Sequence, residues 1–233
     1  MNEFWLNMSA AFTRTFIDSA RYKTFLGGFF TTINIAAFAT VIGIIIGIVV
    51  AIIKVYNYHT GKWKLLNSLM DLYLTVFRGT PIVVQLMILY YIVFVNVNSG
   101  VLVAIISFGI NSGAYLAEVV RAGILAVDQG QSEAGRSLGL SEMKTMRLIV
   151  LPQAFKNILP ALFNEFIALL KETSVVGYIA VIDLTKAGDI VKSRTMDAFF
   201  PLISVALVYL VIVIGLTNVQ KRIEKRLRKS DRR

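Results

Sequence analysis

A stretch of 30 residues, 24–53, carries no charged side chain and most constrains how this chain can fold. A helix crosses the hydrocarbon core of a bilayer with about 20 mostly apolar residues. The composition agrees, because 56% of the residues are hydrophobic and 16% are charged. A soluble domain typically has about 45–50% apolar and about 25% charged residues. The sequence therefore predicts an all-α membrane protein.

Apolar stretches recur along the chain and predict about five transmembrane helices within a domain at 24–220. The second stretch would reach roughly 50 Å as one straight helix, but Arg78 and Pro81 interrupt it. Proline breaks the helical hydrogen-bond ladder and keeps the preceding residue out of the α region. We expect one kinked span there, with two separate spans as the alternative. The predicted spans are 24–53, 65–97, 101–126, 148–170 and 198–220, and the fourth is the least apolar.

The charges around these spans predict which side each end faces. With five spans, 15 Lys and Arg lie in the segments on the side of the C-terminus and seven on the other. The excess of basic residues marks the cytoplasmic side, so we expect the N-terminus outside and the C-terminus inside. The basic tail, 221–233, is expected to meet acidic lipid headgroups. It lacks the interleaved aromatic residues of a nucleic-acid surface, so no nucleic-acid partner is expected.

The first 23 residues form a separate segment. Phe4, Met8, Phe12 and Phe16 recur every four residues, which predicts an amphipathic helix on the outer membrane interface. A stripe packed against the protein core is the alternative. The chain contains no cysteine and one histidine, His59, so we expect no metal site and no disulfide.

The loop between the third and fourth spans is polar and carries a distinctive spacing. Ser132 can cap a short helix with Glu133 in its first turn, and Gly139 suits the end of that helix. Leu138 and Leu140 then project from a water-facing loop, which favours docking into a groove of a partner. An ordinary cytoplasmic helical loop is the alternative.

The spacing in this loop resembles the EAA loop of ABC importer permeases. The segment 133–135 reads EAG, Gly139 follows after three residues, and IVLP follows after nine more at 149–152. The one departure is Gly135, which replaces alanine with a small residue. The resemblance implies a coupling helix at about 132–139 that sits in a cleft of a cytoplasmic ATPase. The implied coupling residues are Ser132, Glu133, Ala134, Gly135, Leu138, Gly139 and Leu140.

A second resemblance covers most of residues 25–217 and points to the polar amino-acid branch of these permeases. It rests on FRGTP at 77–81, GAYLAE at 113–118 and LLKETS at 169–174. The resemblance implies a type I ABC importer transmembrane fold in the cell membrane of a prokaryote. The implied partners are an ABC ATPase dimer that binds ATP and Mg, a second permease copy or similar permease, and an extracellular or periplasmic solute-binding protein. No cofactor is expected on this chain.

Charged residues inside predicted spans point to the transport path, because an ionised group at the bilayer centre is costly unless it faces a cavity or a partner. Glu118 and Glu165, on neighbouring spans, favour a cationic amino group and thus basic amino acids. Structural ion pairs, for example Arg78 with Glu118, are the alternative. Gln85 and Asn164 could bind a carboxylate or amide, but a helix–helix hydrogen bond is the favoured interpretation of both. The candidate path residues are Arg78, Gln85, Tyr115, Glu118, Asn164 and Glu165.

These observations predict a permease subunit that imports polar amino acids with ATP hydrolysed by a partner. The sequence contains no P-loop signature, so we expect the chain not to be an enzyme on its own. The alternatives are an ion-coupled secondary transporter, which would need repeated halves with paired broken helices, and a non-transporting membrane scaffold. Only one clear break, at Pro81, is visible, and no second copy is found, which disfavours the secondary transporter. The scaffold leaves the pattern at 132–152 and the acidic residues within spans unexplained.

Overall fold

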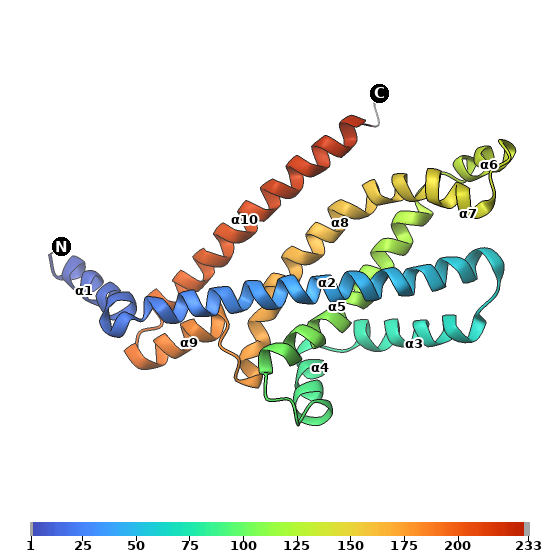
Figure 1. The fold of residues 1–233 in the computed structure, drawn as a ribbon. Coiled ribbons are helices and arrows are strands. Elements are labelled where there is room, and N and C mark those ends of the chain that lie inside the picture. Colours follow the sequence, from blue (N-terminus) through green and yellow to red (C-terminus); the bar gives the residue numbers. More distant parts are fainter. Residues whose placement is uncertain (1, 231–233) are drawn as a thin grey trace. The chain divides into compact units, whose positions relative to one another are not determined.

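The computed structural model describes residues 2–230, and within that range the chain folds into helices and turns without a β-strand (Figure 1). Residues 1 and 231–233, the latter belonging to the predicted basic tail, lie outside the described residues, as does the side chain of Phe4. The all-α prediction is confirmed. The helices are α1 (Asn2–Phe12), α2 (Tyr22–Thr60), α3 (Lys64–Gly79), α4 (Ile82–Ile88), α5 (Gly100–Leu125), α6 (Gln129–Ser137), α7 (Glu142–Thr145), α8 (Leu151–Glu172), α9 (Leu184–Thr195) and α10 (Phe199–Ser230).

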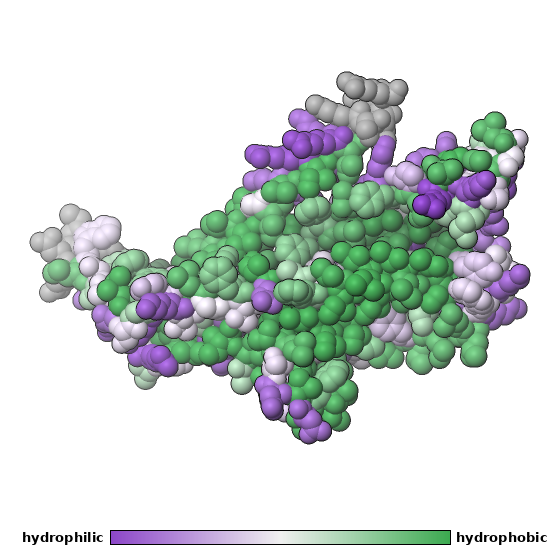
Figure 2. All heavy atoms as spheres, viewed as in Figure 1, coloured by the Kyte–Doolittle hydropathy of each residue, from purple (hydrophilic) through white to green (hydrophobic). Residues whose placement is uncertain are grey.

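Three of the described helices, α2, α5 and α10, are long and apolar enough to cross a membrane. A fourth crossing results if α3 is counted together with the segment Ile82–Val93 as one broken span. Helix α2 has 39 residues, about 58 Å at the usual rise, so it extends beyond the predicted span 24–53 at both ends. Figure 2 shows hydrophobic residues over most of the visible surface of this helix.

The predicted fourth span, 148–170, coincides with α8 and the π-helical turn Met146–Val150 before it. Helix α8 is not among the helices that meet the length and composition of a span. Its sequence carries Lys156 and Glu165 among the apolar residues, and such groups lower the mean hydropathy. A crossing by α8 therefore remains a prediction.

The predicted interruption of the second apolar stretch is present at Thr80 and Pro81. Helix α3 ends at Gly79, and Thr80 is extended, with φ −121° and ψ 148°. This is the region to which a residue before proline is confined. A new helix, α4, begins at Ile82 and passes into the π-helical turn Leu89–Val93. The break leaves Arg78 in the last turn of α3.

The described chain forms two compact units, and the first consists of the residues up to Ala39, Ile82–Phe108 and Ala168–Leu216. Its core is a cluster of buried side chains from α2, α4, α5, the end of α8, the 3-10 segment Thr173–Ile179 and the loop after that segment: Ile35, Ala39, Leu86, Ala104, Phe108, Leu169, Val176, Ile179 and Val181. Buried Asp183 caps α9 by accepting hydrogen bonds from the backbone N–H of Thr185 and Lys186 at 3.0 and 2.9 Å. Leu184 donates its N–H to Thr32 of α2 at 3.1 Å.

The aromatic stripe of the N-terminal segment packs within this first unit. The ring centroids of Phe12 and Phe16 are 4.8 Å apart, and Phe16 lies 5.6 Å from Phe25 of α2. Phe12 also meets Phe200 of α10 edge-on at 6.3 Å. Phe12 nevertheless remains 49% exposed, and Met8 and Phe16 are only partly buried. Its position at the outer membrane interface remains a prediction.

The second unit consists of Thr40–Pro81, Gly109–Ile167 and the residues from Thr217 onward. One cluster of buried apolar side chains joins α2, α5, the turn before α8, and α8: Ala51, Val55, Val120, Ile124, Val150, Ala154 and Ile158. A second joins α2, α3 and α5: Val50, Leu74, Ala114 and Ala117. Gly47 of α2 lies so close to Leu116 of α5 that an added Cβ would stand 2.8 Å from the Leu116 Cβ. The second unit carries both sites described next.

Candidate functional site

A polar hollow of about 630 Å³ lies between α2, α3 and α5 of the second unit. This volume falls in the range of about 300–1,000 Å³ that is usual for small-molecule sites. Charged side chains form much of its wall, although these helices are predominantly apolar. The residues that line it are Lys54, Asp71, Leu74, Thr75, Arg78, Gly79, Tyr115, Glu118 and Arg121.

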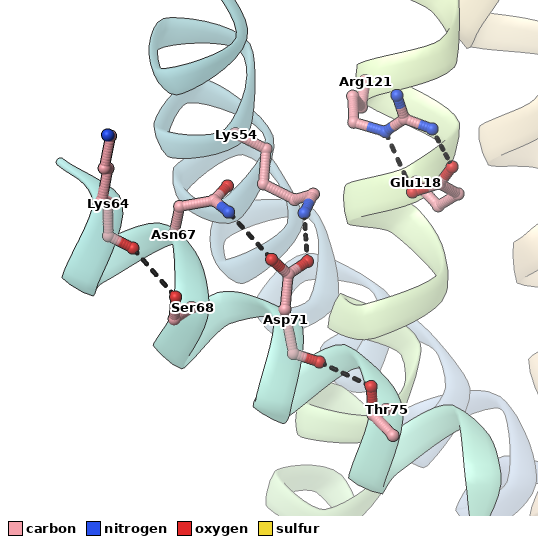
Figure 3. Close-up of polar contacts among 8 residues, drawn as sticks. All are labelled: Lys54, Lys64, Asn67, Ser68, Asp71, Thr75, Glu118 and Arg121. Carbon is pink, nitrogen blue, oxygen red and sulfur yellow. Dashed lines mark hydrogen bonds and ion pairs between the residues drawn. The ribbon is translucent and has the colours of Figure 1, made fainter. Parts of the chain in front are cut away.

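Lys54 of α2 forms an ion pair with Asp71 of α3 across the hollow's wall. Asn67, one turn earlier on α3, donates its side-chain N–H to the other carboxylate oxygen of Asp71 at 2.8 Å. Figure 3 shows Lys54 and Asn67 both pointing at the Asp71 carboxylate. Asp71 therefore has a cation and an amide donor as partners within the protein.

Glu118 is paired with Arg121 on the same face of α5 (Figure 3). The Nε and one terminal nitrogen of Arg121 donate to the two carboxylate oxygens of Glu118. This side-by-side geometry is the strong form of an arginine–carboxylate contact. The alternative of a structural ion pair is thus present at Glu118, but its partner is Arg121 and not Arg78, the example given from sequence. Residues three apart on a helix face each other, which is the signal that identifies Arg121 instead.

Arg78 instead lies over the ring of Tyr115, with its guanidinium carbon 5.6 Å from the ring centroid. This distance is within the range of a cation–π contact. Two hydrogen bonds hold the end of α3 against α5 nearby. Tyr73 donates its hydroxyl to the carbonyl of Ile110 at 2.5 Å, and Asn111 donates its amide to the carbonyl of Phe77 at 2.9 Å. These bonds position Arg78 at the hollow.

The hollow brings together three of the six predicted path residues, Arg78, Tyr115 and Glu118. The other three do not line it. Gln85 is buried within the first unit, Asn164 on α8 is exposed, and Glu165 is partly exposed. Lys54, Asp71 and Arg121 also belong to the site. The sequence indicates Asp71 and Arg121 as further charged candidates nearer the inner face, but it did not indicate Lys54. Lys54 directly follows the uncharged stretch 24–53, which is the signal that could have indicated it.

Helix α6 is the second candidate site, and its start differs from the prediction. The helix runs from Gln129 to Ser137, and Asp128 caps it by accepting a hydrogen bond from the N–H of Gly130 at 2.8 Å. The prediction that Ser132 caps the helix is therefore wrong. Both side chains are competent caps, but the chain enters the helix four residues earlier, after Asp128. Ser132 and Glu133 instead lie within α6.

The end of α6 is where the sequence places it, at Gly139. Its φ is +81°, and it follows the last helical residues directly. The N–H of Leu140 bonds to the carbonyl of Gly135 at 3.1 Å, and the N–H of Gly139 bonds to that of Arg136 at 2.9 Å. This pair of bonds is a Schellman motif, which favours glycine because a side chain is strained at positive φ.

The two predicted docking leucines differ in exposure. Leu138 is 82% exposed, as expected, whereas Leu140 is partly buried, so the prediction that both project into water is wrong for Leu140. Gly135 is buried, and an added Cβ would stand 2.7 Å from Thr145 and 2.9 Å from Ile149. The absence of a side chain at 135 therefore lets α6 approach the next two helical segments closely. Glu133 and Ala134 are exposed beside Leu138.

The apolar helices, the polar hollow and the short helix with an exposed leucine are the features expected of a membrane-embedded transport subunit. The chain belongs to the family described as the binding-protein-dependent transport system inner membrane component, whose model matches residues 43–229. This family implies a substrate-binding protein and an ATPase as partners. The chain is thus a membrane component of a transport system, and an ion-coupled secondary transporter is not supported.

Several relatives are similar over most of their length. The putative glutamine transport system permease protein GlnP of Rickettsia bellii is 39% identical over 86% of this chain and 91% of its own. The arginine transport system permease protein ArtQ of Bacillus subtilis is 38% identical over 88% of this chain and 93% of its own. The glutamine transport system permease protein GlnP of Escherichia coli is 34% identical over 81% of this chain and 88% of its own.

Solved structures share the fold. A crystal structure of an amino acid ABC transporter with histidines matches with a TM-score of 0.82 and 38% identity, covering 91% of this chain and 98% of that one. An inward-facing methionine ABC transporter, MetNI, matches with a TM-score of 0.76 at 21% identity, covering 88% of this chain and 97% of that one. The predicted type I ABC importer transmembrane fold is confirmed.

Proposed function

We propose that this chain is the permease subunit that carries polar amino acids into the cell, driven by ATP that a partner subunit hydrolyses. The observation that carries the proposal is the family match over residues 43–229. Relatives of 38–39% identity are named for the transport of glutamine and arginine. A hollow with charged walls suits a substrate of this class, because amino acids carry both a carboxylate and an ammonium group.

In this proposal α6 is the coupling helix that receives the motion of the ATPase. Leu138 offers an exposed apolar side chain that can enter a groove of the ATPase. The polar residues around it keep the unbound helix compatible with water. The residues proposed to contact the ATPase are Ser132, Glu133, Ala134, Leu138 and Gly139, with Gly135 and Leu140 shaping the helix and its end. ATP-driven closure of the ATPases would move α6 and rock the bundle between two access states.

The proposed assembly contains two copies of this permease, or this permease and a similar one. The five predicted spans of a single chain are too few to enclose a transport path with gates. We place the N-terminus outside, where a solute-binding protein delivers substrate, and the C-terminus in the cytoplasm. In this proposed topology the chain crosses the membrane five times, and α8 is the fourth crossing. ATP and Mg bind to the ATPase dimer. The polar hollow is the proposed part of the path on this chain.

Reconstitution tests this function. The chain is purified with its ATPase and solute-binding protein partners and placed in vesicles that hold ATP and Mg. We expect labelled amino acid to accumulate with ATP and not with the non-hydrolysable analogue AMP-PNP. Uptake driven by a sodium or proton gradient without ATP would refute the proposal. Amino-acid mixtures of polar, apolar, basic and acidic members define the substrate class.

A further inference from the structure

The polar hollow has an uneven set of charges. Its ionisable wall residues are three cations, Lys54, Arg78 and Arg121, and two carboxylates, Asp71 and Glu118. Each carboxylate is engaged by one of the cations, Asp71 by Lys54 and Glu118 by Arg121. At neutral pH these five groups add to one positive charge. Within residues 2–230, Arg78 has no carboxylate partner.

Arg78 lines the hollow, and among the described residues its guanidinium makes a ring contact but no hydrogen bond. Its guanidinium carbon lies 5.6 Å from the centroid of the Tyr115 ring, and the guanidinium carries five N–H donors in a planar fork. The side chains of both Arg78 and Tyr115 are exposed to the hollow. The planar fork of N–H groups matches a carboxylate, which it can bind through two parallel hydrogen bonds.

We propose that Arg78 is the residue that binds the α-carboxylate of the substrate, and that the hollow selects amino acids with an uncharged side chain over basic ones. This inference rests on the proposed function. The Asp71 and Glu118 side chains are 52% and 32% exposed, so their oxygens remain accessible to the α-ammonium group. A zwitterion thus finds a partner for each of its charges.

A basic side chain adds a positive charge where the hollow already has an excess of one. Charges near a protein surface interact at an effective dielectric constant of about 20, far below that of water, so this repulsion is felt within the hollow. The sequence favoured basic substrates because Glu118 and Glu165 lie within neighbouring predicted spans, and Glu165 does not line the hollow. The contact with Arg121 compensates the charge of Glu118, and the uncompensated group in the hollow is Arg78.

The test measures binding to the permease–ATPase complex in lipid nanodiscs without the solute-binding protein, so that only the complex selects. The probes are L-glutamine, L-arginine and 4-aminobutanamide, which is glutamine without its α-carboxylate. We expect the wild type to bind glutamine more tightly than arginine. Arg78→Met should weaken glutamine binding by about tenfold to a hundredfold, the usual effect of losing a hydrogen bond to a charged group. Binding of 4-aminobutanamide should not weaken.

Two further variants separate a binding role from a structural one. Arg78→Lys keeps the charge but not the fork and should retain part of the glutamine affinity. Arg222→Met removes an exposed arginine from the last part of α10, away from the residues that line the hollow, and should leave glutamine binding unchanged. Unchanged 4-aminobutanamide binding by Arg78→Met shows that this variant is folded.

Three results would overturn the inference: equal glutamine affinity in Arg78→Met and wild type, tighter binding of arginine than glutamine by the wild type, or no glutamine binding by the wild type. None of these depends on whether ATP drives uptake. Failure of the proposed function would instead appear as vesicles that accumulate no amino acid with ATP, so the two failures are distinguishable.

Discussion

Two adjacent glycines in α2, Gly27 and Gly28, differ sharply in what an added methyl group would meet. At Gly28 a Cβ would stand 2.5 Å from the carbonyl oxygen of Asp183 and 2.9 Å from the nitrogen of Leu184. At Gly27 it would meet nothing within 4 Å. We therefore expect Gly28→Ala to destabilise the protein and Gly27→Ala not to.

The difference between the two variants isolates the steric term. Alanine gains about 0.5–1 kcal/mol over glycine in a helix interior, and this gain is common to both. Overpacking a tight contact costs about 1–3 kcal/mol. The atoms opposite Gly28 belong to backbone that is itself held, because Leu184 donates its N–H to Thr32 at 3.1 Å. Gly28→Ala should thus be about 1–3 kcal/mol less stable than Gly27→Ala, which is about 2–12 °C in Tm for a chain of this size.

Thermal unfolding in one detergent, followed by far-ultraviolet circular dichroism and by retention of the monodisperse peak on size exclusion, measures this difference. Gly27→Ala should unfold at or slightly above the wild-type temperature. If the two variants unfold at the same temperature, the close approach of α2 to the start of α9 is wrong. A lower Tm for Gly27→Ala than for Gly28→Ala would contradict the reasoning outright.

Three other substitutions probe the sites. Gly139 has φ +81°, so Gly139→Ala should lower the free energy of unfolding by about 1–2 kcal/mol and speed hydrogen exchange of the α6 amides. The control Gly61→Ala, at φ +66° in another turn, should leave the exchange of the α6 amides unchanged. Leu138→Asp should leave Tm unchanged, because the side chain is 82% exposed, but should reduce copurification of the ATPase; full copurification would argue against docking through Leu138. Asp183→Ala should lose about 0.5–2 kcal/mol of capping free energy, and Asp183→Asn much less; equal losses in thermal unfolding would show that the cap of α9 is not the cause.

Much of the fold was accessible from sequence because its signals are local. The uncharged stretch 24–53 predicts a spanning helix from composition alone, and α2 contains it. Pro81 predicts a break because the restriction on Thr80 acts between neighbouring residues, and Thr80 is extended. Gly139 predicts the end of a helix because only glycine takes positive φ readily. None of these needs knowledge of what lies across the fold.

Part of the candidate site was accessible for the same reason, and part was not. A charged residue within a span indicates a cavity or a partner wherever it occurs, so Arg78 and Glu118 could be identified as members of the site. Sequence spacing does not say which carboxylate meets which cation between helices, and the pairing of Asp71 with Lys54 depends on how α2 and α3 lie together. Gln85 and Asn164 were indistinguishable from path residues until their surroundings were known.

The sequence by itself determined that this chain is a helical membrane protein, where its helices break, and which loop carries the coupling spacing, because hydropathy, proline and glycine act within a few residues. The tertiary structure alone decided that, among the cations lining the hollow, Arg78 makes no ion pair with a described carboxylate. It also decided that Asp128 rather than Ser132 caps α6 and that Gly28 but not Gly27 is in tight contact. Those outcomes depend on distances between residues far apart in the chain, and only packing sets such distances.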